Sequence, residues 1–349
     1  MSNLETLNLQ LSKLSINVLS YNNHRSINAL LDYWKNYNVQ LNIIDGSNVP
    51  FTPCIEVEQY PLHFNYCHMP LSYEDRIKFL VSLPLRKFSL FCATDEIFIP
   101  QSVSRIINYL ELNSDYTSGN GQCIQLKLKI KTSNVIDRNI YHLMKDIPSL
   151  CNSSNTLHNV STFFDNYVCA TIYSVTRSSA WKKSILFAFQ HTYSSPYVYE
   201  RLIEASNIYQ GKFYYLDQPT WIRNGINKPE YLTINRNCTL KRWRKSTNYK
   251  NEQFAVKQLI SKYFDLSCSD DIESFYNKIL PATHFLPFKL RMITFMRSSP
   301  LVSSILTKVT KNNNLHSISN HSFVSFHDRI SCVEANPSLA SKFFMSSIL

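Results

Sequence analysis

The sequence predicts an α/β protein with a mostly parallel sheet flanked by helices, followed by a basic, mostly helical region. In the first third of the chain, short apolar runs rich in β-branched residues alternate with segments that carry apolar residues at helical spacing. Alternation of this kind favours a parallel sheet. The chain has 349 residues, 44% of them hydrophobic and 13% aromatic, which suffices for one large or two ordinary domains.

The first strand–helix–strand unit lies between residues 14 and 47. LSINVLS, from Leu14, is typical of a strand, and YNNHRS interrupts it. INALLDYWKNY then has helical spacing, and VQLNIIDGS is a second short apolar run that ends in a turn signal. A helix between two strands predicts that the strands are parallel.

The alternation continues to residue 112. SYEDRIKFLVSLP predicts a helix that begins near Ser72, FSLFCA a strand, and PQSVSRIINYLEL a helix with Pro100 in its first turn. In parallel sheets, ligands bind beyond the carboxyl ends of the strands. We therefore expect three polar stretches to meet there: Tyr21-Asn22, Asp45-Gly46-Ser47 and Asp95-Glu96.

Beyond residue 113 the pattern is more varied. NSDYTSGNGQ predicts a polar loop, and QLKLKIKT predicts an exposed antiparallel strand with a basic outer face. We expect a loop over about 149–159, a strand in FFDNYVCATIYSV and a helix in SSAWKKSILFAFQ. YVYERLIEASNIY predicts a helix that ends at Gly211, and KFYYLD predicts a further strand.

Positive charge is concentrated in the last third of the chain. Residues 1–230 hold 20 Lys and Arg against 18 Asp and Glu, whereas residues 231–349 hold 16 against 7. We expect one domain over 1–230 and a basic extension over 231–349, with helices in EQFAVKQLISKYF and IESFYNKIL. Such an excess can meet nucleic acid, anionic lipid or a phosphorylated substrate. No recognised nucleic-acid-binding module is present, so nucleic acid is not an expected partner.

Several classes of protein do not fit the sequence. The first residues lack the apolar segment of a signal peptide, and no window has the unbroken apolar run of a membrane span, so we expect a cytoplasmic protein. The nine cysteines form no CxxC pair, which suits reduced thiols without a disulfide or a zinc site. The fingerprints of dinucleotide-binding oxidoreductases, P-loop kinases and serine hydrolases are absent.

Each candidate residue at the predicted strand ends has two interpretations. One interpretation of Asp95 and Glu96 is that their carboxylates stabilise the positive N-terminal end of the helix that begins near Pro100. The other is that they bind a divalent cation or ribose hydroxyls. Asp45 belongs either to a simple turn or to a site, where it would accept from a base or a ribose. Arg76 is either a surface charge or a cation directed at a phosphate or a base.

The second half of the chain adds three candidates. Glu200 and Glu204 lie one helical turn apart and so share a face of the helix. Either both are solvated, or one of them faces the sheet edge and acts as a general base. Arg223 follows a predicted strand and is either a surface charge or a phosphate ligand. The histidines lack metal-ligand spacing and are interpreted as structural.

Taken together, five stretches resemble the bacterial glycosyltransferase domains related to the family 2 glycosyltransferases, which have the nucleotide-sugar-binding GT-A fold. The stretches are VLSYNNHRSINALLDYW, IIDGS, LSYEDRIKFL, FCATDEIFIPQSV and GKFYYLDQPTWIRN, within about Leu14–Asn227. The resemblance implies a nucleotide pocket lined by Ser20, Tyr21 and Asn22, with Asp45 at the base and Arg76 near the nucleotide. Thr94, Asp95 and Glu96 stand where the family has three acids, and they depart from that pattern at Thr94 and Glu96.

The resemblance also implies an inverting transfer of a sugar to a glycan or lipid-linked acceptor in surface polysaccharide synthesis. Glu200 would be the catalytic base. Mg²⁺ or Mn²⁺ bound at Glu96 would stabilise the leaving diphosphate, and Arg223 would do so if no metal is bound. The alternative is a catalytically degenerate domain that only binds a nucleotide or a partner. FLPFKLRMITFMRSSPLVSSILTKVTK in the basic region either lies along an anionic membrane surface at the inner face of the cell membrane or packs as a helical subdomain.

Overall fold

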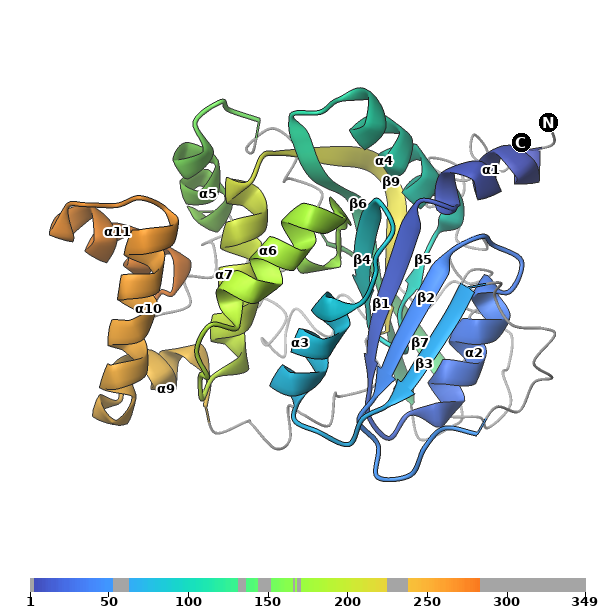
Figure 1. Cartoon of the computed structure of the whole chain (residues 1–349), viewed down its shortest axis with the longest axis horizontal. Helices are drawn as coiled ribbons and strands as arrows, with labels where there is room; N and C mark the ends of the chain where they lie inside the picture. Colours follow the sequence, from blue (N-terminus) through green and yellow to red (C-terminus); the bar gives the residue numbers. More distant parts are fainter. Residues whose placement is uncertain are drawn as a thin grey trace, which may run out of the picture.

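The computed structural model describes residues 3–52, 63–130, 136–143, 152–165, 167, 171–224 and 238–282. Within them, one mixed sheet of nine strands runs through the molecule, with helices on both of its faces (Figure 1). The strands are β1 (Leu14–Ser20), β2 (Gln40–Asp45), β3 (His63–His68), β4 (Phe88–Cys92), β5 (Ile97–Phe98), β6 (Tyr116–Ile130), β7 (Ile136–Leu143), β8 (Val175–Arg177) and β9 (Lys212–Asn224). Their order is β3-β2-β1-β4-β8-β6-β9-β5, and β7 pairs with β6.

Most strands of the sheet run in one direction. β2, β1 and β4 form a parallel set that β3 extends at the edge, and β6 and β9 are parallel to each other. β8 is antiparallel to both β4 and β6 and joins the two parallel parts. β5 and β7 are antiparallel to their partners. The predicted α/β class, with a mostly parallel sheet flanked by helices, is confirmed.

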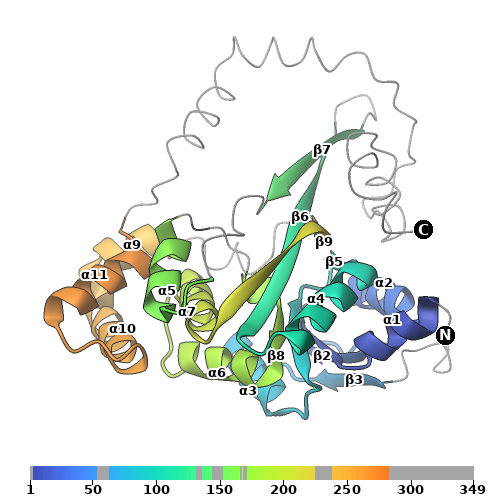
Figure 2. The same ribbon diagram turned by 90° about the horizontal axis from the view of Figure 1, so that it is seen from above.

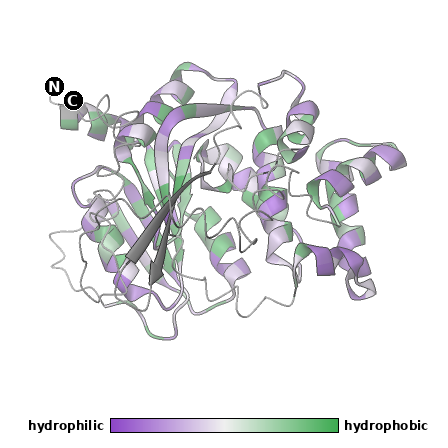
Figure 3. Cartoon of the chain, turned by 180° about the vertical axis from the view of Figure 1, so that it is seen from behind, coloured by the Kyte–Doolittle hydropathy of each residue, from purple (hydrophilic) through white to green (hydrophobic). Residues whose placement is uncertain are grey.

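The helices form two layers around the sheet. They are α1 (Asn3–Leu11), α2 (His24–Trp34), α3 (Tyr73–Ser82), α4 (Pro100–Leu112), α5 (Thr156–Asp165), α6 (Ser178–Ala188), α7 (Pro196–Tyr209), α9 (Leu240–Lys245), α10 (Lys250–Tyr263) and α11 (Ser269–Ile279). α1, α2 and α4 lie on one face of the sheet and α3, α6 and α7 on the other (Figures 1 and 2). The strands between them are largely apolar in Figure 3, as expected for a sheet covered on both faces.

Local sequence explains where these helices begin. The hydroxyl of Ser72 accepts from the backbone N–H of Asp75 at 3.1 Å and so caps α3, whose first turn carries Glu74 and Asp75. Pro100 occupies the first turn of α4, where its missing N–H has no consequence. The predicted helix starts near Ser72 and at Pro100 are confirmed.

Two predictions in the middle of the chain are wrong. The predicted polar loop NSDYTSGNGQ overlaps β6, which begins at Tyr116. A Cβ at Gly121 would lie 2.4 Å from the carbonyl oxygen of Gln218 in β9. Gly121 therefore allows β6 to approach β9 closely and does not mark a loop. The described residues of the predicted strand FFDNYVCATIYSV belong instead to the end of α5, to the 3-10 helix Thr171–Tyr173 (η2) and to the start of β8.

Short apolar runs do not distinguish a strand from a buried helix, which explains the error in FFDNYVCATIYSV. Phe163 and Phe164 belong to α5 and are buried. α5 begins at Thr156, so residues 156–159 of the loop expected over 149–159 are helical instead. α1 and the edge strand β3 were not predicted.

The described part of the basic region is helical and packs on the sheet domain. The hydroxyls of Ser206 in α7 and Tyr263 in α10 lie 2.6 Å apart, and Arg201 Nη1 donates to the carbonyl of Ile279 at 3.4 Å. One continuous apolar core includes residues of both regions, among them Trp243. No helix within the described ranges is long and apolar enough to cross a bilayer. The boundary expected at residue 230 and the segment 285–311 lie outside the described residues.

Candidate active site

The carboxyl ends of β1, β2 and β3 lie side by side. In the strand register Ser20 is opposite Asp45, and Asp45 is opposite His68. Backbone hydrogen bonds continue past the strands, from Gly46 N to the Ser20 carbonyl at 2.9 Å and from Met69 N to the Asp45 carbonyl at 2.7 Å. Two of the three polar stretches predicted to meet at this edge therefore do so.

Asp45 organises the loops at this edge. Its carboxylate is fully buried and accepts from Ser47 N at 3.1 Å, from Ser47 Oγ at 2.5 Å and from the hydroxyl of Tyr66 at 3.0 Å. His24 Nε2 lies 3.3 Å from the same carboxylate. Ser47 Oγ in turn accepts from the backbone N–H of Asn22 at 2.8 Å. The buried carboxylate thus fixes the loop after β2 against the loop after β1.

The hydroxyl of Tyr66 remains a donor to Asp45 over a wide pH range. Burial, reinforced by the hydrogen bond to the carboxylate, raises the pKa of Tyr66 to about 12. The same hydroxyl accepts from Phe51 N at 2.8 Å, so it also holds the segment that follows β2. Tyr66 therefore belongs to the support of the site.

Arg76 brings a positive charge to the same edge. Its side chain is buried, and Nη1 donates to the carbonyl of Ser20 at 2.6 Å. Burial lowers the pKa of Arg76, although a guanidinium stays charged near neutral pH. The guanidinium lies against Gly46, where an added Cβ would be 2.4 Å from Arg76 Cζ. A side chain at this position would therefore displace the Arg76 guanidinium.

Ser20 Oγ, Arg76 Nε and His24 Nε2 are buried at this edge without a hydrogen-bond partner among the described residues. Of these, His24 Nε2 lies 3.3 Å from the Asp45 carboxylate, which leaves Ser20 Oγ and Arg76 Nε for a ligand. Buried polar atoms are nearly always hydrogen-bonded, so an orphaned pair on neighbouring residues is an expected feature of a binding site. Beside them, the ring of Tyr21 is 44% exposed, with Arg76 Cζ 6.0 Å from its centroid.

The third polar stretch is joined to the first by one hydrogen bond. Asn23 Nδ2 donates to Thr94 Oγ1 at 2.9 Å. Thr94 is buried, whereas Asp95 is partly exposed. Thr94 therefore connects the loop after β4 to the start of α2.

Glu96 lies at the far side of this stretch, paired with residues of β9. Its Oε2 accepts from Trp221 Nε1 at 2.9 Å, and its Oε1 is 3.3 Å from Arg223 Nε. The Trp221 ring stacks with Phe98, at a centroid distance of 6.0 Å, and with Tyr173, at 4.5 Å. The Glu96 carboxylate is almost fully buried, while the Arg223 side chain is 32% exposed. Arg223 is thereby held with its cation at the surface of the sheet edge.

The side chains around Glu96 do not fit the ligand set of Mg²⁺ or Mn²⁺. Both carboxylate oxygens already have partners, and one partner is a guanidinium that repels a second cation. Thr94 offers a hydroxyl where such hard ions prefer carboxylate oxygens. In the part of the chain that the structure describes, no group of three or more His, Cys, Asp or Glu side chains could hold a metal ion. We therefore derive no step through a metal, and the cation remains a prediction from the family resemblance.

The two glutamates of α7 have different surroundings. Glu200 is partly exposed and accepts from the hydroxyl of Tyr167 at 2.7 Å. Glu204 is fully buried and accepts from the backbone N–H of Thr171 at 3.0 Å, which anchors η2. Glu204 therefore supports the fold, and of the two only Glu200 has the exposure that a base acting on an acceptor needs.

The structure thus brings most of the predicted residues to one edge of the sheet. Ser20, Tyr21, Asn22, Asp45 and Arg76 form one connected group, which Asn23 joins to Thr94. Glu96, just before β5, and Arg223 on β9 form a second group, and the hydrogen bond of Glu200 goes to Tyr167 instead of to either group. The supporting residues that the sequence analysis missed are His24, Tyr66, Tyr173 and Trp221, whereas Ser47 belongs to a stretch that it expected at this edge.

No family model and no curated protein matches this sequence. Among solved structures, the chain is similar to Staphylococcus aureus TarS 1–349 in complex with UDP-GlcNAc, with a TM-score of 0.49 and 11% identity over 84% of this chain and 77% of that one. It is also similar to the mannosyltransferase PcManGT from Pyrobaculum calidifontis in complex with GDP-Man and Mn²⁺, with a TM-score of 0.43 and 9% identity over 94% of this chain and 80% of that one. With TM-scores of 0.49 and below, we take no conclusion about function from these likenesses.

Proposed function

We propose that this protein is an inverting glycosyltransferase that binds a nucleotide sugar at the carboxyl edge of its sheet. In this proposal residues 1–230 are the catalytic domain, and residues 231–349 are a basic extension that brings it to the inner face of the cell membrane. The acceptor is a glycan or a lipid-linked glycan in surface polysaccharide synthesis, and the transferred group is a hexose or a related sugar.

The observation that supports this proposal best is the group of residues around Asp45. Ser20 Oγ and Arg76 Nε are buried polar atoms without a hydrogen-bond partner among the described residues, beside the exposed ring of Tyr21. An aromatic face, a buried cation and hydroxyl groups are suited to a nucleotide, which has a flat base, hydroxyls and negative charge. In an α/β sheet such a ligand is expected beyond the carboxyl ends of the strands.

In the proposed reaction, Glu200 takes the proton of an acceptor hydroxyl. The acceptor oxygen then forms a bond to the anomeric carbon of the sugar, while the bond from that carbon to the nucleoside diphosphate breaks on the opposite side. The electron pair of the broken bond stays on the diphosphate, so the configuration at the anomeric carbon is inverted. Arg223, fixed by Glu96 and Trp221, supplies positive charge for the leaving diphosphate.

Transfer and hydrolysis assays with a panel of UDP, GDP and dTDP sugars test this proposal. Glu200→Gln should retain binding of the donor and lose turnover, because the amide cannot accept the acceptor proton. Asp45→Ala should lose both, because it releases the loops that form the pocket. If Glu200→Gln retains the turnover of the wild type, Glu200 is not the base.

A second candidate is a catalytically degenerate domain that only binds a nucleotide. Thr94 stands in place of an acid, and the Glu96 carboxylate is occupied by Trp221 and Arg223. Titrations with UDP and GDP, with and without Mn²⁺, separate the candidates when they are combined with the turnover assays. Saturable binding without turnover of any donor in the panel would favour the degenerate domain.

A further inference from the structure

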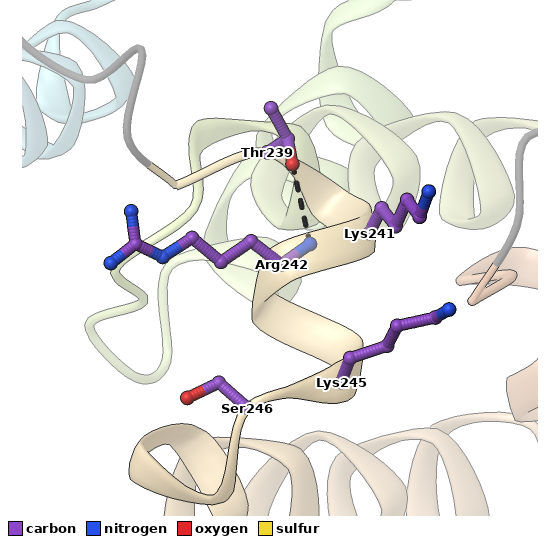
Figure 4. Close-up of a pocket in the computed structure, with 5 residues that line it drawn as sticks. All are labelled: Thr239, Lys241, Arg242, Lys245 and Ser246. Carbon is purple, nitrogen blue, oxygen red and sulfur yellow. Dashed lines mark hydrogen bonds between the residues drawn. The ribbon is translucent and has the colours of Figure 1, made fainter.

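α9 carries a cluster of cations, flanked on either side by a hydroxyl residue. Lys241, Arg242 and Lys245 are exposed and, with the hydroxyl residues Thr239 and Ser246, line a hollow on the surface (Figure 4). We call the three cations the α9 basic patch. In Figure 3 the α9 segment is strongly hydrophilic. Residues 236–250 hold six Lys or Arg and no Asp or Glu.

The opposite side of α9 fixes the direction of these cations. Leu240 and Trp243 are buried in the core, and Trp243 Nε1 donates to the Glu252 carboxylate at 2.6 Å. Thr239 Oγ1 accepts from Arg242 N at 3.2 Å and caps the helix. Because the apolar side chains of the helix are anchored, the patch is held toward solvent without help from a partner.

The positive charge of the patch is not neutralised within the described residues. None of Lys241, Arg242 and Lys245 lies within ion-pair distance of a carboxylate there, although Lys257 and Lys278 on the next helices pair with Glu273 and Asp165. Glu252 is instead bound by Ser194 and Trp243. An unpaired cluster next to paired lysines indicates a surface for an anionic partner.

The patch lies at the same end of the molecule as the candidate active site. α7 leads directly into β9, which runs parallel to β6, so the first turn of α7 is toward the carboxyl edge of the sheet. Ser195, just before α7, donates from Oγ to the carbonyl of Cys238 at 2.9 Å and so ties the start of α9 to this end. In Figure 1, α9 is at the lower end of the molecule, where β1 and β2 terminate.

We propose that the α9 basic patch docks the protein on an anionic lipid bilayer, with the carboxyl edge of the sheet directed toward the membrane. Lys241 and Lys245 point to one side of the helix and Arg242 to the other (Figure 4), which spreads the charge over a surface instead of converging on one phosphate. The docking stands on the patch itself. Only its use, to present the site to a lipid-linked acceptor, rests on the proposed function.

Co-sedimentation of the full chain with vesicles tests the docking. The vesicles are phosphatidylcholine mixed with phosphatidylglycerol, with phosphatidylcholine alone as the uncharged reference. Each cation near an anionic surface contributes about fivefold to the partition coefficient, so the partition coefficient of the triple variant Lys241→Gln, Arg242→Gln, Lys245→Gln should be about 125-fold lower. Binding of the wild type should weaken as salt is raised.

The matched control removes the same charge from the opposite edge of the sheet. Lys13, Lys87 and Lys212 lie at the amino ends of β1, β4 and β9. The variant Lys13→Gln, Lys87→Gln, Lys212→Gln should keep most of the binding of the wild type. Equal losses in the two triple variants would mean that net charge alone drives the binding, and an unchanged patch variant would mean that another surface docks. Either result overturns the proposal.

Two further measurements separate the remaining alternatives. Glycerol phosphate or a DNA duplex that displaces the protein from vesicles at low concentration would reveal a phosphate or nucleic-acid site at the patch, and that would also overturn the membrane assignment. Titration with UDP and GDP is independent of the patch, so the patch variant should bind nucleotide as the wild type does. If docking depends on the patch but no nucleotide binds, the proposed function fails while the docking stands.

Discussion

Replacement of Gly46 by alanine tests the packing that holds Arg76 at the candidate site. The added Cβ would lie 2.4 Å from Arg76 Cζ and 2.5 Å from Nη1, far inside ordinary contact distance. The guanidinium must therefore move, and its hydrogen bond to the Ser20 carbonyl, now 2.6 Å long, breaks. Because the Arg76 side chain is buried, no solvent replaces this bond fully.

The size of the effect follows from this one contact. Loss of a hydrogen bond to a charged group costs about 1.5–3 kcal/mol, and the lower chain entropy of alanine returns about 0.4–1 kcal/mol. We expect Gly46→Ala to lower the free energy of unfolding by about 0.5–2.5 kcal/mol, or the melting temperature by roughly 1–8 °C. Urea denaturation followed by circular dichroism measures the change. Affinity for UDP or GDP should fall with it.

A double-mutant cycle isolates the clash from other effects of the substitution. In an Arg76→Ala background the new methyl group has room, so Gly46→Ala should be neutral or slightly stabilising there. The two substitutions should therefore be strongly non-additive. If Gly46→Ala costs the same free energy in both backgrounds, the contact between Gly46 and Arg76 is not the reason for the glycine.

Three further predictions address the supporting residues. In urea denaturation, Trp221→Phe should lower the free energy of unfolding by about 1–3 kcal/mol more than Trp181→Phe does. Trp221 Nε1 donates to the buried Glu96, whereas the equally buried Trp181 Nε1 has no hydrogen-bond partner in the described residues. Equal losses would contradict the role of this bond. Glu204→Ala should destabilise the fold by about 1–3 kcal/mol because it leaves Thr171 N unpaired, whereas Glu200→Ala should change stability little. The raised pKa of Tyr66, about 12 against 10.0 for an unperturbed tyrosine, means that the folded state holds this proton more tightly. Its contribution is full below about pH 10 and is lost as the pH rises toward about 12, so wild-type stability should fall more steeply there than that of Tyr66→Phe.

The sequence predicted the parallel half of the sheet well because each element there has a clear local signal. Leu14–Ser20 and Pro100–Leu112 were predicted with their observed bounds, since a β-branched run and a proline at a helix start leave little choice. The strand β6 was partly missed because its glycines serve a pairing with β9, which is distant in sequence. Non-local pairing of this kind has no signature in a single segment.

The site could be predicted in its location more than in its details. The positions of Ser20 and Asp45 at strand ends follow from strand periodicity, and parallel pairing brings them together. That Asp45 accepts from Tyr66, and that Glu96 pairs with Arg223, depends on contacts between residues 21 or more positions apart in the chain. A carboxylate in a sequence does not reveal its partners, so its role as a ligand or as a support for a loop had to come from the fold.

The central claim is that the carboxyl edge of the sheet binds a nucleotide sugar, with Arg223 beside its diphosphate. Isothermal titration of the wild type with UDP and GDP sugars tests it most directly, compared with Arg223→Gln and with Lys212→Gln at the opposite end of the same strand. We predict saturable binding of at least one donor, weakened about 10- to 100-fold by Arg223→Gln and unchanged by Lys212→Gln. The absence of binding by every donor, or equal affinities for the wild type and Arg223→Gln, would contradict the claim.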